Sequence, residues 1–110
     1  MTFEVVFTDE ASFQVLQIQD WIAERSITGA QSWLAAFRLA VDKLKQRGSG
    51  FGFAPESPQF PEPLYQILFR TRRGLTYRAL FVVRNSTVHV VSVRGFGRDL
   101  VGPDDVTLPE

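Results

Sequence analysis

The chain contains no cysteine, which excludes disulfide frameworks, thiolate zinc sites and cysteine nucleophiles. It contains a single histidine, so we expect no transition-metal site, and no other cofactor is implied. No apolar run approaches the roughly 20 residues that a membrane-spanning helix needs. The first residues also lack the basic-then-apolar pattern of a secretory signal. We therefore expect a cytoplasmic protein.

A net charge is also lacking, because twelve basic residues balance twelve acidic ones. The distribution is uneven: residues 1–62 and 99–110 are acidic, whereas residues 63–98 contain no acid. That segment carries seven arginines, which are Arg70, Arg72, Arg73, Arg78, Arg84, Arg94 and Arg98. Guanidinium groups bind phosphate through paired hydrogen bonds and stack on nucleobases. The segment either pairs with acids from elsewhere in the fold or forms an anion-binding surface, and we favour the second interpretation.

Hydrophobic periodicity predicts the elements of a single domain of 110 residues. Residues 3–7 (FEVVF) alternate like a half-buried strand, and two apolar stripes predict helices that end near Arg25 and Arg47. Trp21 and Trp33 fall within these helices, where we expect both to pack in the core. Three glycines and four prolines predict that residues 48–63 form an irregular connector.

Three strand-like runs follow at residues 64–71, 75–84 and 87–94, and short turns join them into an antiparallel meander. The predicted fold is α+β in the order β-α-α-β-β-β, an antiparallel sheet with a two-helix hairpin covering one face. The chain then divides into a strand and helical hairpin (1–47), the connector (48–63), an arginine-rich meander (64–98) and an acidic tail (99–110).

Side-chain alternation assigns the arginines of the meander to faces of the sheet. The aromatic-rich positions face the helices. The other face, which we expect to be open, collects Gln66, Arg70, Arg78 and Arg84. If the loop at residues 85–86 has two or four residues, His89 lies opposite Val82 on this face and Arg94 lies on the covered face. A loop of three or five residues reverses both assignments.

The element order, together with LYQILFRTRRGLTYRALFVV (64–83), TVHVVSVRGFGRDL (87–100) and APES (54–57), resembles the RelE/ParE toxin superfamily. Its members are the toxin halves of bacterial type II toxin-antitoxin modules, some of them known as plasmid stabilisation proteins. The resemblance spans nearly the whole chain. It implies a cognate antitoxin that wraps the toxin and covers the arginine-rich face.

For function, the resemblance implies first a RelE-like endoribonuclease that cleaves mRNA on the ribosome and thereby inhibits growth. Arg78, followed by Arg94 or Arg98, would bind and activate the scissile phosphate. His89 is the candidate general base, because no other side chain here has an unperturbed pKa near neutrality. The remaining arginines would bind RNA: Arg70, Arg72, Arg73, Arg84 and Arg98.

Two alternatives stay open. ParE-type members poison DNA gyrase without catalysis, and VSVRGFGRDL (91–100) looks somewhat closer to that branch; Arg78, Arg94 and Arg98 would then be contact residues. The second alternative is a degenerate, non-toxic module that keeps the fold and the antitoxin. Gln66 and Leu68 suggest it, because they replace the paired lysines of the ribonuclease members, and no tyrosine follows Tyr77.

Overall fold

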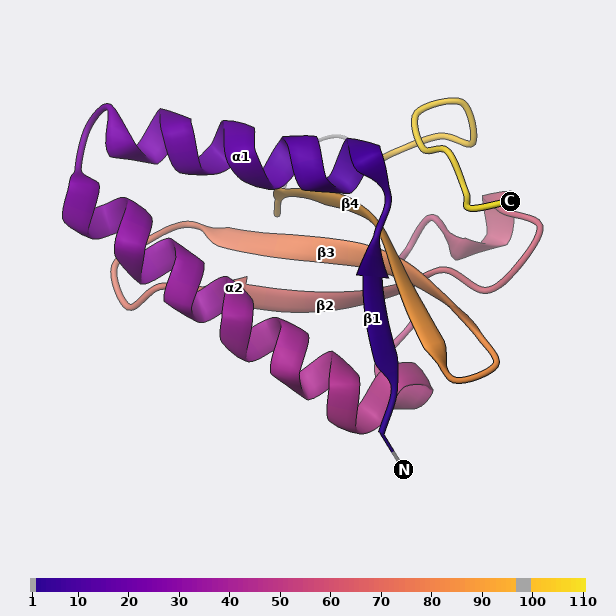
Figure 1. Cartoon of the computed structure of the whole chain (residues 1–110). Coiled ribbons are helices and arrows are strands. Elements are labelled where there is room, and N and C mark those ends of the chain that lie inside the picture. Colours follow the sequence, from indigo (N-terminus) through magenta and orange to yellow (C-terminus); the bar gives the residue numbers. More distant parts are fainter. Residues whose placement is uncertain (1, 97–99) are drawn as a thin grey trace.

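Two helices lie against one face of a four-stranded sheet (Figure 1) in a computed structural model that describes residues 2–96 and 100–110. The elements are β1 (Glu4–Phe7), α1 (Asp9–Ala23), α2 (Ile27–Arg47), β2 (Tyr65–Arg70), β3 (Thr76–Arg84) and β4 (Thr87–Gly95). The predicted α+β class and element order are confirmed. Within the described ranges, no helix is both long enough and apolar enough to cross a membrane.

The sheet is mixed, with the strand order β1-β4-β3-β2. The meander of β2, β3 and β4 is antiparallel as predicted, but β1 runs parallel to β4, with Glu4 opposite Thr87 and Phe7 opposite Val90. The prediction of a wholly antiparallel sheet is therefore wrong. The helical hairpin provides the long crossover that parallel pairing needs, and alternation along β1 identifies a strand without identifying its partner.

Local chemistry fixes the helix ends. Thr8 caps α1 by accepting a hydrogen bond from the amide of Ala11, and Ser26 caps α2 in the same way. Gly48 ends α2 with a φ of 44°, a backbone conformation that favours glycine. A Cβ at this position would lie 2.5 Å from the ring of Phe3, so glycine also allows the chain before β1 to pack against the end of α2.

The main core lies between the helices and the sheet. Trp33 is 2% exposed and stacks on Phe37 with ring centroids 5.4 Å apart, which confirms its predicted packing role. Trp21 is 51% exposed, so the same prediction for Trp21 is wrong. Its neighbour Ile22 packs against the core, and adjacent helical residues point about 100° apart. Trp21 therefore lies at the edge of the surface through which α1 packs on the core, and half of its side chain is exposed to solvent.

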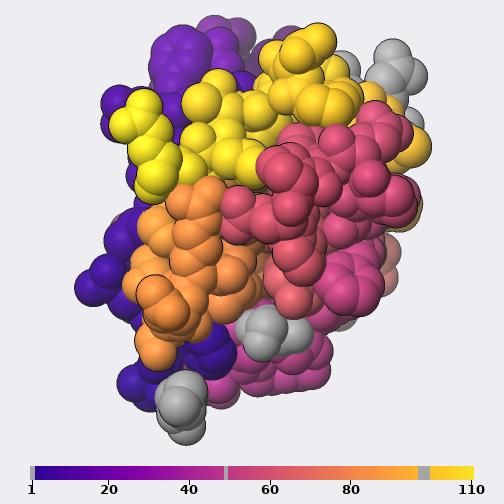
Figure 2. All heavy atoms as spheres, turned by 90° about the vertical axis from the view of Figure 1, so that its right-hand side faces the viewer, coloured from indigo at the N-terminus to yellow at the C-terminus, as the bar shows by residue number. Residues whose placement is uncertain are grey.

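A second, smaller core covers the other face of the sheet. It joins Leu80, Val82 and Val91 of the strands to Ala54 and Leu64 near the connector and to Val101 and Val106 of the C-terminal segment (residues 100–110). Figure 2 shows the C-terminal segment against the connector, above the β3–β4 hairpin. The expectation of an open face is therefore wrong. Both covering segments lack a helical or strand period, so periodicity could not reveal them.

Candidate functional site

The arginine face is the sheet face opposite the helices, and it carries Arg70, Arg78, Arg84 and Arg94. The β3–β4 loop has two residues, Asn85 and Ser86, so Val82 lies opposite His89 as the first register predicts. The register then shifts, since Leu80 pairs with Ser92 and Phe81 with Val90. This bulge at Val91 inverts the alternation beyond it. Arg94 consequently lies opposite Arg78 on the arginine face, which corrects its predicted place on the covered face.

Arg78 is the centre of the site, and it is buried in an ion pair with Glu56. Nη1 of Arg78 donates to Oε1 of Glu56 at 2.8 Å, and Nη2 donates to Oε2. Nη1 also donates to the side-chain oxygen of Gln66 at 3.2 Å. Arg78 is 3% exposed and Glu56 is fully buried. An internal carboxylate therefore occupies the guanidinium edge that a phosphate would use.

The connector and the C-terminal segment hold Glu56 in place. The amide of Ala54 donates to the carbonyl of Leu64 at 2.8 Å, and the amide of Leu64 donates to Oγ of Ser57 at 2.9 Å, which closes the APES turn around Glu56. From the other side, the amide of Val101 donates to Oε2 of Glu56 at 3.0 Å. The carboxylate thus links three separate parts of the chain.

These contacts control the ionisation of Glu56. Burial alone would raise its pKa, but the hydrogen bonds from Arg78 and from the Val101 amide outweigh burial and lower the pKa from 4.5 to about 2. Glu56 is therefore a carboxylate at any physiological pH. It is a permanent counterion for Arg78 and supplies no proton near neutrality.

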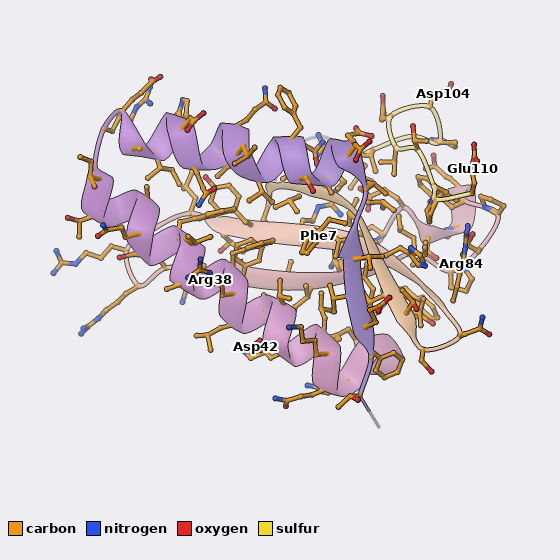
Figure 3. The ribbon with its side chains drawn as sticks, viewed as in Figure 1. Phe7, Arg38, Asp42, Arg84, Asp104 and Glu110 are labelled. Atoms are coloured by element: carbon orange, nitrogen blue, oxygen red, sulfur yellow. The ribbon has the colours of Figure 1, made fainter. Side chains whose placement is uncertain are left out.

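A second ion pair lies further along the arginine face. Arg84 donates to both oxygens of Glu62, at 3.1 Å from Nε and at 2.7 Å from Nη2, and to the backbone carbonyl of Glu110 at 3.2 Å. Figure 3 shows Arg84 and Glu110 at the same end of the molecule. The hydrogen bond from Arg84 lowers the pKa of Glu62, and the same bond raises the pKa of Arg84. A predicted RNA-binding arginine is thus engaged within the chain.

The predicted catalytic residues do not converge. His89 lies opposite Val82, four residues along β3 from Arg78, which is about 13 Å at roughly 3.3 Å per residue. Arg94 is close to Arg78, and its buried Nε has no hydrogen-bond acceptor among the residues that the structure describes. A general base must come within hydrogen-bond reach of its proton. The arrangement therefore brings two arginines together with one carboxylate and leaves His89 apart.

The other predicted arginines lie at the end of the sheet near the β2–β3 turn. Arg70 is exposed in β2, and Arg72 and Arg73 are exposed on the turn itself. Arg98 lies outside the described residues. Within the described ranges, no group of three or more metal-binding side chains is found.

Sequence reasoning placed Arg70, Arg78 and Arg84 on one face but missed Glu56 and Glu62, the acids that pair with two of them. Both acids lie in the proline-rich connector, where no period assigns side chains to faces. The available signal was that these are the two acids of residues 48–63, immediately before a segment with seven arginines. That signal favoured internal pairing, the interpretation given less weight above.

Comparison with known proteins adds no assignment: no protein-family model matches the chain, and no curated protein matches it. The resemblance to the RelE/ParE superfamily stays a prediction from the residues quoted above.

Proposed function

We propose that this chain is the toxin of a type II toxin-antitoxin module and that it acts by binding its target, as gyrase-poisoning ParE-type toxins do, without cleaving RNA. One observation carries the non-catalytic part of this proposal. The arginine at the position that RelE-type ribonucleases would use for catalysis is buried against Glu56.

The energetics of that ion pair disfavour phosphate chemistry at Arg78. A phosphate could reach the guanidinium only by displacing Glu56, and separating a buried ion pair costs about 3–5 kcal/mol. Arginine also stays protonated at physiological pH and cannot accept the proton of an attacking 2′-hydroxyl. His89, the one candidate base, is about 13 Å away along the sheet by strand spacing. A toxin that only binds its target needs neither the displacement of Glu56 from Arg78 nor the approach of His89.

Two further observations support the toxin part of the proposal. The element order β-α-α-β-β-β agrees with the order that the resemblance implies. Arg70, Arg72 and Arg73 are exposed at one end of the sheet, so positive charge remains available for an acidic partner such as an antitoxin segment. mRNA cleavage stays a prediction of the resemblance, and the same experiment tests it.

The test is inducible expression of the wild-type chain in a bacterial host without an antitoxin. We expect growth arrest with accumulated DNA breaks, read by a damage-responsive reporter, and intact translated mRNA, read by primer extension. Arg78→Lys should keep the toxicity in proportion to the amount of folded protein, because Arg78 contacts no target in this proposal. Co-expression of the protein encoded by the adjacent gene should restore growth if that protein is the antitoxin.

Three outcomes would contradict this proposal. mRNA cleavage that disappears in Arg78→Lys at equal levels of folded protein would establish a ribonuclease. Growth arrest with intact DNA would exclude gyrase as the target. Unimpaired growth at high levels of folded protein would favour the degenerate, non-toxic module.

A further inference from the structure

A hollow of about 790 Å³ lies between the corner that joins α1 to α2 and the β2–β3 turn. Both of these segments lie at the left end of the molecule in Figure 1. The walls come from the end of α1, the first two turns of α2 and residues 71–75. Cavities of this size typically hold small organic ligands. The chemistry of the walls then decides which class of ligand fits.

Trp33 lines the hollow and carries a hydrogen-bond donor without a partner. Its side chain is 2% exposed, and its buried Nε1 has no acceptor among the residues that the structure describes. The ring itself is well packed, because Phe37 stacks on it at 5.4 Å and Tyr77 meets it edge-on at 5.6 Å. A buried tryptophan N–H usually has a partner, since an unsatisfied donor loses its hydration without replacement. An oxygen atom of a ligand in the hollow would supply the missing acceptor.

The first turn of α2 adds more donors to the same hollow. The amides of Ile27 and Thr28 have no acceptor within the helix, because the first amides of any α-helix precede its hydrogen-bonded turns. The hydroxyl of Ser26 accepts from the amide of Gly29 at 2.8 Å and so caps a different group. The positive end of the helix dipole favours an anion at this position.

The rest of the wall combines positive charge with apolar surface. Arg72 and Arg73 line the hollow and are exposed, whereas no carboxylate within the described ranges lines it. Trp21 and Leu75 line it as well, and they are 51% and 72% exposed. The hollow therefore suits a ligand that has an anionic group and an apolar part.

From these features we propose that the hollow binds a small phosphate monoester with an apolar or aromatic organic part, such as a nucleoside 5′-monophosphate. Phosphate has three terminal oxygens, which accept from guanidinium groups and helix amides at the same time, whereas a carboxylate has two. The organic part packs on Trp21 and Leu75, and an oxygen of the ligand accepts from Nε1 of Trp33.

This inference goes beyond the proposed toxin function and does not depend on it, because the purified chain alone should bind the ligand. A bound phosphate would contact Arg72 and Arg73, two of the three arginines that remain available to an acidic partner. The small ligand and such a partner should therefore compete for the chain.

The experiment titrates the folded, ¹⁵N-labelled chain at low ionic strength with AMP, inorganic phosphate and adenosine, and follows binding by two-dimensional NMR. The chain has two tryptophans, so its spectrum has two indole N–H peaks, and Trp21→Phe identifies the peak of Trp33. We expect AMP to shift this peak and the amide of Thr28, with a Kd of about 1 mM or lower. Inorganic phosphate should shift the Thr28 amide more weakly, and adenosine should bind at least tenfold more weakly than AMP.

The first variant removes positive charge from the site. Arg72→Gln combined with Arg73→Gln should weaken AMP binding at least tenfold. The matched control removes two charges from the exposed side of α2, as Arg38→Gln, at the arginine labelled in Figure 3, combined with Lys43→Gln. This control should stay within twofold of wild type. All four positions are exposed, so circular dichroism should show an intact fold in both variants.

The second variant places a negative charge in the site. Thr28→Glu should abolish AMP binding by repulsion, while the fold stays intact because an acid is favourable at a helix N-terminus. Ala35→Glu, at an exposed position further along α2, is the control and should bind normally.

Four outcomes would overturn the proposal. The first is the absence of any shift of the Thr28 amide or the Trp33 indole with AMP at about 10 mM. The second is adenosine that binds as tightly as AMP, because the phosphate would then contribute nothing. The third is normal binding by either site variant. The fourth is a poly(U) RNA with a 5′-hydroxyl end that binds more tightly than AMP and depends on the same residues, which would establish a site for the nucleic-acid backbone instead.

Discussion

Replacing Glu56 with glutamine keeps the size of the side chain and removes the charge that neutralises Arg78. Because both residues are buried, Arg78 would keep its positive charge in a site without a counterion. Removing one partner of a buried ion pair generally costs about 3–5 kcal/mol. We expect Glu56→Gln to lower the free energy of unfolding by this amount at pH 7, a large share of the about 5–15 kcal/mol that stabilises a typical domain.

The pKa of Glu56 gives an independent magnitude. The folded state lowers it from 4.5 to about 2, and each unit is equivalent to about 1.36 kcal/mol, which gives about 3 kcal/mol. Since the pKa is depressed on folding, this stabilisation is fully present above about pH 4.5 and is lost as the pH falls through about 2. The Glu56→Gln variant should lack this contribution to the acid sensitivity of the wild-type chain.

Urea denaturation followed by circular dichroism measures both effects. With an m-value of about 1.5 kcal/mol/M, a loss of about 3–5 kcal/mol should lower the urea midpoint of Glu56→Gln by about 2–3 M at pH 7. Glu62→Gln is the matched control, because its partner Arg84 is partly exposed and that pair should contribute much less. Replacing both members of the buried pair, as Glu56→Leu with Arg78→Met, should recover most of the loss.

Two results would refute this reasoning. One is a decrease in the free energy of unfolding of less than about 1 kcal/mol for Glu56→Gln, which would mean that water enters the site or that Arg78 moves to another partner. The other is an equal loss of stability between pH 4.5 and pH 2 in the variant and the wild type. Either result would reopen Arg78 as an accessible anion-binding group and weaken the case for a non-catalytic function.

Three further perturbations test features of the fold. Gly48→Ala should lower the free energy of unfolding, measured by thermal denaturation, by about 1–3 kcal/mol, because φ is positive there and the ring of Phe3 occupies the space of the new Cβ. Gly52→Ala is the control: there is open space around Gly52, so the free energy of unfolding should change little. Gln14→Ala should lower the free energy of unfolding, measured by urea denaturation, by about 1–3 kcal/mol, because the hydroxyl of Ser92 and the amide of Val93 lose their hydrogen-bond acceptor. Val106→Asp should release the C-terminal segment, measured as faster proteolysis after residue 100, because it places a charge in the second core.

Each of these predictions has its own contradicting result. Equal melting temperatures for the two glycine variants would show that the end of α2 rearranges at little cost. Unchanged hydrogen exchange at the amides of β4 in Gln14→Ala would mean that another group covers the amide of Val93. A C-terminal segment that resists protease in Val106→Asp would show that the second core contributes little to holding it.

Local sequence signals determined much of this fold. The alternation of residues 3–7, the cap at Thr8 and the glycine at position 48 each act through their neighbours in the chain. These features were therefore predictable from short windows. The pairing of β1 with β4 joins residues that are far apart in the sequence, and no period in either strand specifies it.

In the candidate site too, local features were predictable from the sequence and contacts between distant segments were not. The arginines share a face because strand alternation places them there, but the counterions come from an irregular segment and meet the strands only in three dimensions. One extra residue at Val91 then moved Arg94 to the opposite face from the one that alternation predicts. Charge counted along the sequence thus located the face correctly and overestimated how much of its charge is available.

The parallel pairing of β1 with β4 also affects how the chain can fold during synthesis. β1 leaves the ribosome roughly 80 residues before its partner Thr87–Val90. At about 5–20 residues per second, β1 waits roughly 4–16 s without a neighbouring strand. During that interval Phe3, Val5 and Phe7 can be buried only against the helical hairpin. The nascent chain is therefore most exposed to aggregation and proteolysis before its last strand emerges, and a product truncated before Thr87 cannot complete the sheet.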